Sequence, residues 1–190
     1  TTGEGGMIVV NNDQLAEKCR ELRNLCFKND KRFIHDNLGW NLRMTNLQAA
    51  VGVAQLEQLD DFIVKKRWIG ERYTELFSNL EGVQLPLIST SYSKNIYWVY
   101  GMVLDDSINV NANEIMSNLI KNGIGCRPFF YPLHQQPVLK KLRLFKDQKF
   151  PNSEKLYQKG FYIPSGLAIT EEQILIVSNT VKKIIKEIND

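Results

Sequence analysis

The sequence predicts an α/β protein in which a long helix links two lobes and a compact two-layer α/β domain follows. Three observations lead to this prediction. The 190 residues, 43% hydrophobic and 24% charged, are enough to bury a core. A proline-free helical pattern begins at a capping box and continues over residues 45–77. After it, β-branched and aromatic runs alternate with amphipathic runs, a pattern typical of strands and helices packed in two layers.

The first part of the chain predicts a strand, a helix and a loop. The apolar residues 8–10 follow a glycine-rich turn and predict a short buried strand. Asn12 and its neighbours offer N-cap oxygens to a helix with one apolar face, formed by Leu15, Cys19, Leu22 and Cys26. Residues 27–38 are charged and irregular, so we expect a mobile surface loop there.

The long helix predicted over residues 45–77 begins with Thr45 and Gln48, whose side chains can satisfy backbone N–H groups of the first turn. Its first half is apolar on more than one side and is expected to be buried. Its second half is charged and is expected to face water. At about 1.5 Å per residue, such a helix would span roughly 48 Å, which suits a connection between two lobes.

Four strands are predicted in the second half of the chain, over residues 83–85, 96–104, 124–127 and 161–163. The second of these is rich in β-branched and aromatic residues. We therefore expect Tyr97, Trp98 and Tyr100 in the core.

Two helices are predicted among these strands. The first covers residues 112–121 and is expected to end at Gly123 in the left-handed conformation. The second begins at another capping box, Thr170 with Gln173. Its apolar face is formed by Ile174, Val177, Val181, Ile184 and Ile188.

Composition argues against several classes of function. The formal net charge of +3 is too small and too scattered to predict nucleic-acid binding. No apolar run reaches the roughly 18 residues of a membrane span, and no secretory leader is recognisable, so we expect a cytoplasmic protein without a membrane partner. The cysteines, Cys19, Cys26 and Cys126, lack the spacing of a zinc site and are interpreted as buried thiols, with no metal expected.

Three segments resemble one family. They are TTGEGGM at residues 1–7, GWNLRMT at residues 39–45 with the helix start behind it, and RPFFYPLHQQP at residues 127–137. In this order they are similar to motifs of the DegT/DnrJ/EryC1/StrS family, the sugar aminotransferases that depend on pyridoxal 5'-phosphate (PLP). The resemblance extends from Thr1 to about Val181.

This resemblance implies the C-terminal part of a type I PLP-dependent fold, like that of aspartate aminotransferase. Residues 1–50 would be the last portion of the large PLP-binding domain, residues 45–77 the linking helix, and residues 78–190 the small C-terminal α/β domain. It also implies a homodimer whose two active sites are shared between subunits.

The resemblance assigns Asn41 to the cofactor phosphate of the opposite subunit, with Arg43 as a second phosphate ligand. Amide and guanidinium donors beside a helix N-terminus suit a dianionic phosphate. The alternative is structural, with Asn41 forming a turn and Arg43 an interface ion pair.

By the same resemblance, Arg127 and His134 approach the nucleotide-linked sugar. His134 can equally be a structural histidine. Lys66 or Arg67 is a candidate contact for the diphosphate of the substrate, and the alternative is a solvated helix face.

The implied reaction is transfer of an amino group, from glutamate, to a nucleotide-linked keto-sugar in the biosynthesis of deoxyamino sugars and lipopolysaccharide. The perosamine synthetase branch, which acts on a GDP-linked 4-keto-6-deoxyhexose, resembles the chain most. The Schiff-base lysine would lie upstream of Thr1, so we expect the chain alone to be inactive. Two alternatives stay open: a dehydratase of the same family, and a non-catalytic dimerisation or interaction module.

Overall fold

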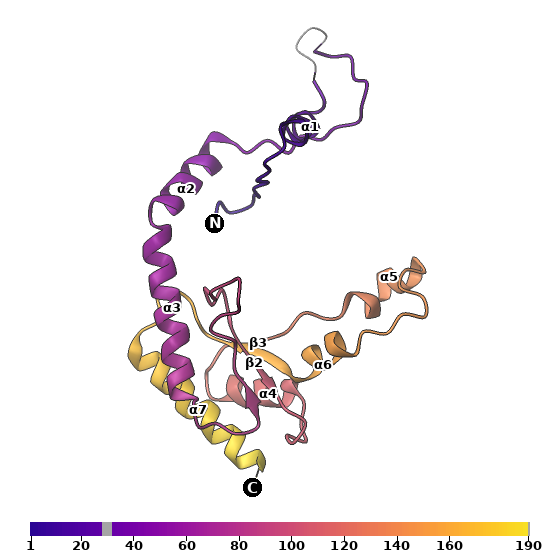
Figure 1. Cartoon of the computed structure of the whole chain (residues 1–190). Coiled ribbons are helices and arrows are strands. Elements are labelled where there is room, and N and C mark those ends of the chain that lie inside the picture. Colours follow the sequence, from indigo (N-terminus) through magenta and orange to yellow (C-terminus); the bar gives the residue numbers. More distant parts are fainter. Residues whose placement is uncertain (28–31, 190) are drawn as a thin grey trace. The chain divides into compact units, whose positions relative to one another are not determined.

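The computed structural model describes residues 1–27 and 32–189. The chain divides into two compact units, residues 1–60 and residues 61–190, which are described separately here (Figure 1). Part of the predicted loop over residues 27–38 lies outside the described residues. The predicted domain assignment, with boundaries near residues 50 and 78, remains a prediction about the whole protein.

The second unit is built on a four-stranded antiparallel sheet. Its strands are β1 (Val83–Gln84), β2 (Tyr100–Leu104), β3 (Arg127–Pro128) and β4 (Gly160–Ile163), in the order β1-β2-β4-β3. Along β2 the fully buried side chains of Tyr100, Met102 and Leu104 alternate with half-buried positions. One face of the sheet therefore forms the floor of the core.

Three helices cover this face: α3 (Leu59–Leu76), α4 (Ala112–Lys121) and α7 (Glu171–Asn189). Each contributes buried apolar residues, among them Ile69 and Tyr73 from α3, Ile115 and Leu119 from α4, and Ile174 and Val181 from α7. The predicted two-layer α/β architecture is confirmed.

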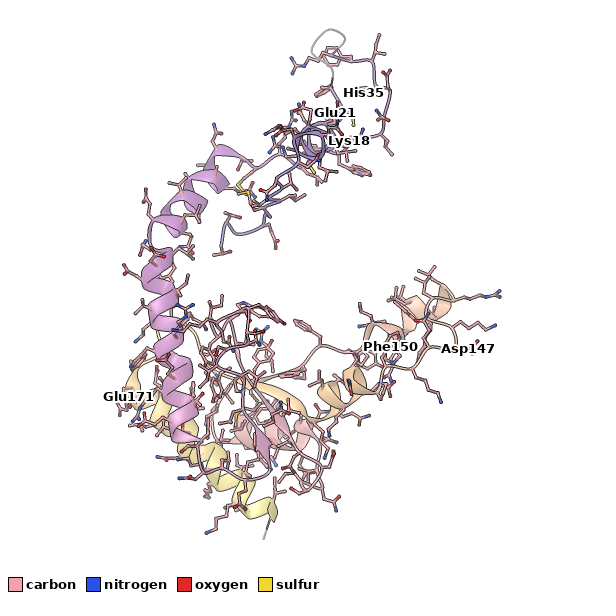
Figure 2. The ribbon with its side chains drawn as sticks, in the orientation of Figure 1. Lys18, Glu21, His35, Asp147, Phe150 and Glu171 are labelled. Atoms are coloured by element: carbon pink, nitrogen blue, oxygen red, sulfur yellow. The ribbon has the colours of Figure 1, made fainter. Side chains whose placement is uncertain are left out.

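An ion pair, a capping box and a glycine define the ends of these helices. Arg72 of α3 donates to Glu171 at the start of α7 over 2.6 Å, and Figure 2 labels Glu171. The capping box of α7 is present, because Thr170 N donates to Gln173 and Gln173 N donates to the Thr170 hydroxyl. Gly123 has a φ of 76°, which ends α4 as the sequence predicts.

Two predicted strands differ from the observed ones. Strand β2 begins at Tyr100 instead of residue 96, because Tyr97 has a left-handed φ of 51° and its N–H donates to the side chain of Asn95. Trp98 is 68% exposed, so its expected place in the core is wrong. Strand β3 begins at Arg127 and includes Pro128, which an edge strand tolerates because no ladder N–H is needed there.

Between β3 and β4 the chain forms short helices that the sequence pattern did not indicate. They are the 3-10 turn η1 (Leu133–Gln135), α5 (Pro137–Lys141) and α6 (Pro151–Lys159). Both α-helices begin with proline at the first helical position, where its missing N–H is not needed.

The first unit contains α1 (Asp13–Arg23) and α2 (Asn46–Glu57). Asn12 caps α1 as predicted, and Lys18 and Glu21 form an ion pair on it (Figure 2). Residues 8–10 are exposed and form no strand, so that prediction is wrong within the described chain. A strand needs a hydrogen-bonding neighbour, and the described part of this unit has only the isolated bridge between Asn24 and Asn41.

The predicted helix over residues 45–77 is divided into α2 and α3 at Gln58. The side chain of Gln58 donates back to the carbonyl of Ala54. The first half is exposed, in contrast to the expected burial: no residue of α2 is buried, and Leu47 is 82% exposed. Of the cysteines, which are all free thiols, Cys26 is buried, whereas Cys19 and Cys126 are only half-buried.

Candidate functional site

Asn41 and Arg43 lie together with Asn24 in the first unit. The Nε of Arg43 donates to Oδ1 of Asn41 over 3.1 Å, and its Nη1 donates to Oδ1 of Asn24 over 3.0 Å. Both asparagine oxygens are thus used as acceptors. Within the described residues, no hydrogen bond of the two amide N–H₂ groups or of the remaining guanidinium N–H groups is recorded, so these groups can donate to another ligand.

The backbone holds this cluster by pairing two segments. Trp40 N donates to Leu22 O, Leu25 N donates to Trp40 O, and Leu42 N donates to Arg23 O, over 2.8 to 3.0 Å. Gly39 allows the close approach, because a Cβ there would lie 2.6 Å from the backbone nitrogen of Cys26. The glycine of the GWNLRMT segment therefore has a packing reason.

The donor set of this cluster fits a phosphate. Asn24, Asn41 and Arg43 supply N–H donors and one positive charge, and no carboxylate contacts any of these side chains within the described residues. The N-terminus of α2 follows directly, and its dipole also favours an anion.

Gln48 connects the two N-terminal motifs. Its Oε1 accepts from the N–H of Thr45, which completes the predicted capping box, and its Nε2 donates to the carbonyl of Glu4 over 3.2 Å. The N-terminal amine also donates to Gln55. The turn of residues 1–6 is thus held against α2. The sequence pattern predicted the capping box but gave no sign of the contact between Gln48 and Glu4.

Lys66 and Arg67 contact backbone carbonyls in the second unit. The ammonium of Lys66 donates to Trp98 O over 3.0 Å and to Ser165 O over 2.6 Å, and Arg67 donates to Asn95 O. Burial lowers the pKa of Lys66. These contacts support a structural role for Lys66, and its predicted contact with a substrate diphosphate stays a prediction.

We expect Lys66→Met to lower the free energy of unfolding by about 1–2 kcal/mol, because two carbonyls lose their donor and the site is only partly screened by water. Urea titration followed by circular dichroism measures the change. Lys65→Met is the matched control, since Lys65 lies over the ring of Trp68 and should matter less. An unchanged stability for Lys66→Met would contradict a structural role for this lysine.

Arg127 and His134 lie in different surroundings within the second unit. Arg127 is exposed on the edge strand β3, and no hydrogen bond or ion pair of its side chain is recorded with the described residues. The Nε2 of His134 donates to Oε1 of Glu154 over 2.8 Å, and the side chain of His134 is only 9% exposed. This contact lowers the pKa of Glu154. The structure does not place the two residues in one contact cluster.

The chain is similar in fold to solved structures of sugar aminotransferases. Helicobacter pylori PseC, an aminotransferase involved in the biosynthesis of pseudoaminic acid, matches 98% of the chain and 50% of its own length with a TM-score of 0.88 at 22% identity. A Streptococcus pneumoniae protein solved in a PLP form matches 99% of the chain and 49% of its own length with a TM-score of 0.84 at 17% identity. The fold is therefore that of a type I PLP-dependent aminotransferase, of which the chain covers half.

The sequence profile of the DegT/DnrJ/EryC1/StrS aminotransferase family matches residues 1–182, and the chain belongs to this family. It is 38% identical to the GDP-perosamine synthase of Vibrio cholerae over 183 residues, which are 96% of the chain and 48% of that protein. The chain spans about half the length of the curated relatives it matches. The family and the PLP-form neighbour indicate PLP as the cofactor.

Among the described residues, no helix is both long enough and apolar enough to cross a bilayer.

Proposed function

We propose that the chain forms part of a PLP-dependent aminotransferase that transfers an amino group from glutamate to a nucleotide-linked keto-sugar. The observation that carries the proposal is the donor cluster of Asn24, Asn41 and Arg43 at the start of α2. In this proposal Asn41 and Arg43 hold the cofactor phosphate. The bound cofactor supplies the electron sink, and the protein supplies orientation and charge.

The identity of 38% to the Vibrio cholerae GDP-perosamine synthase supports a GDP-linked 4-keto-6-deoxyhexose as the acceptor. Arg127, exposed and without a recorded partner in the described chain, is suited to an anionic group of this substrate. His134 is oriented by Glu154 and faces the same substrate in our proposal. Lys66 and Arg67 do not touch the substrate in this proposal. They hold the loop that contains Asn95 and Trp98 in place by donating to its backbone carbonyls.

The rest of the proposal concerns the whole protein. It is a cytoplasmic homodimer in polysaccharide biosynthesis, and its Schiff-base lysine lies upstream of Thr1. The chain alone is then inactive, because the residues that bind the cofactor ring are contributed by the other half.

The test is the variant Asn41→Ala in a full-length protein, in which this chain follows an N-terminal half like that of its relatives. The dissociation constant of pyridoxamine phosphate, measured by calorimetry, should rise by about 10- to 100-fold, because a charge-assisted contact contributes about 1.5–3 kcal/mol. This amine form cannot bond covalently to a lysine, so the measurement isolates the phosphate contact. The mass of the dimer should not change.

Asn113→Ala on α4 is the control, since Asn113 is exposed and lies in the other unit. An unchanged dissociation constant for Asn41→Ala would assign Asn41 a structural role, through its bridge to Asn24 and its contact with Arg43. In that case the proposal that the cluster of Asn24, Asn41 and Arg43 binds the cofactor phosphate would be rejected.

One observation favours the alternative of an interaction module. Large apolar side chains are exposed on residues 7–10 and on α2, including Leu47 at 82% and Leu56 at 64%. Such a patch drives association. We therefore expect light scattering of the purified chain to give a mass above 21.9 kDa. A monodisperse monomer of that mass would remove the alternative.

A further inference from the structure

The turn that follows α1 has an unusual backbone conformation. Leu25 and Cys26 come directly after Asn24, and their φ values are 59° and 51°. Two successive left-handed residues that carry side chains are rare, because the Cβ of each lies too close to the following carbonyl oxygen. This turn therefore needs contacts that hold it. Its conformation also decides where Asn24 lies, and Asn24 belongs to the donor cluster at the start of α2.

Backbone hydrogen bonds satisfy the N–H groups of this turn. Leu25 N donates to Trp40 O over 3.0 Å. Cys26 N donates to Glu21 O over 2.8 Å. The carbonyl of Leu25 has no backbone donor recorded in the described part of the chain, so its partner has to come from a side chain.

His35 supplies that partner, and Figure 2 labels it. The Nδ1 of His35 lies 2.8 Å from Leu25 O. A carbonyl oxygen only accepts, so Nδ1 carries the proton in this contact. The ring of His35 also packs against Phe27, with centroids 5.3 Å apart, and Phe27 contacts Phe33 edge to face at 6.1 Å. A side chain ten residues further along the chain thus closes the turn.

The contacts continue from His35 to the donor cluster. His35 holds the carbonyl of Leu25, the residue that follows Asn24. Asn24 forms the isolated bridge with Asn41, and its Oδ1 accepts from Arg43 over 3.0 Å. Without the bond from His35, we expect the left-handed turn to relax toward a commoner conformation and to displace Asn24. The guanidinium of Arg43 would then lose one of its two recorded acceptors in the described chain.

We propose that His35 is a positioning residue for the cofactor phosphate. It does not touch the phosphate itself. Through Leu25 it holds Asn24, and through Asn24 it holds Arg43, in the arrangement that a phosphate requires. The inference rests on the proposed function, in which the cluster of Asn24, Asn41 and Arg43 binds that phosphate.

The test is the variant His35→Leu in the full-length protein. The dissociation constant of pyridoxamine phosphate, measured by calorimetry, should rise by about 3- to 10-fold, the effect of one ordinary hydrogen bond. His35→Asn should restore the affinity of the parent protein, because the Nδ2 of asparagine takes the place of Nδ1 and can donate to Leu25 O. Phe33→Leu is the matched control. It removes a ring beside Phe27, leaves the bond of His35 intact and should not change the affinity.

Pyridoxamine, which lacks the phosphate, separates positioning from a general loss of structure. Its dissociation constant should be the same in His35→Leu as in the parent protein. Equal weakening of both amines, or failure of His35→Asn to restore the affinity, would overturn the proposal. An unchanged affinity in His35→Leu would overturn it too. If Asn41→Ala still weakens binding in that case, the proposed function stands without His35.

The protonated nitrogen of His35 can be observed in the 190-residue chain, which contains only two histidines. Long-range proton–nitrogen correlation spectra distinguish an imidazole protonated at Nδ1 from one protonated at Nε2. Above a pH of about 8, where a histidine of ordinary pKa is neutral, we expect the proton of His35 on Nδ1. The variant His35→Leu identifies its signals against those of His134. A proton on Nε2 alone would leave Leu25 O without this donor and would reject the proposal.

Discussion

Replacing Gly70 by alanine should destabilise the second unit by up to about 2 kcal/mol. Gly70 is buried in α3, and a Cβ there would lie 2.2 to 2.5 Å from three ring carbons of Tyr97. The ring cannot move away easily, because Tyr97 is 1% exposed and packs against Tyr100 at 6.1 Å. Overpacking of this kind typically costs about 1–3 kcal/mol and outweighs the roughly 1 kcal/mol that alanine adds to helix propensity.

Urea unfolding followed by circular dichroism measures this loss, and Gly125→Ala is the control. Gly125 has no atom within 4 Å of an added Cβ, so its variant should remain close to the parent protein. The clash has a further signature. Combining Gly70→Ala with Tyr97→Gly, which accepts the left-handed backbone at residue 97, should cost less than the sum of the two single changes. Strict additivity would contradict the clash as the cause.

Alkaline pH should unfold the same unit. Burial raises the pKa of Tyr100 from 10.0 to about 12 and raises the pKa of Tyr73 as well. Above pH 10 the unfolded chain loses phenolic protons that the folded chain keeps, so the unfolded state binds fewer protons and stability falls as pH rises. Each tyrosine can contribute up to about 1.4 kcal/mol per pH unit. Together they can remove roughly 4 kcal/mol between pH 10 and 12.

Lys66 works in the opposite direction, because its lowered pKa makes stability rise with pH below its ordinary value of 10.5. The free energy of unfolding measured in urea at several alkaline pH values gives the net slope. Tyr100→Phe should reduce the slope of unfolding free energy against pH by an amount equivalent to up to one bound proton. The variant loses the contact between Tyr100 and Thr74, but the Thr74 hydroxyl still donates to Gly70 O. A slope that this variant does not change would show that Tyr100 is not the group responsible.

The elements that the sequence predicted well carry their own local signals. Helix α4 has the predicted bounds because Asn111 caps it and Gly123 ends it, and both signals lie within one turn of the helix. The strand predicted to begin at residue 96 fails for the opposite reason. Its β propensity is local, but the ring of Tyr97 fills the space at Gly70, far away in sequence. At Tyr97, the packing of the ring against Gly70 therefore outweighs the β propensity of the local sequence.

The candidate site shows the same division. Asn41 and Arg43 are two residues apart, so their contact could be expected from the motif. Asn24 and Gln48 reach partners 19 and 44 residues away, and no pattern in the sequence indicates those contacts. Lys66 looked like part of a solvated basic cluster, yet its partner Ser165 is 99 residues away. The turn with left-handed residues at Phe145 and Asp147 contains neither glycine nor proline, so the residues there do not predict it clearly.

The strand order has a consequence during synthesis of the protein. The central pair of the sheet joins β2 to β4, and residues 105–159 must be made before the two can meet. The core then still lacks α7, whose buried residues extend to Ile185. At about 5–20 residues per second, the apolar strand β2 therefore remains without its neighbour β4 for seconds after it is made. Over that interval the exposed apolar strand of the nascent chain needs protection from aggregation. The second unit can complete its core only when α7 has been made.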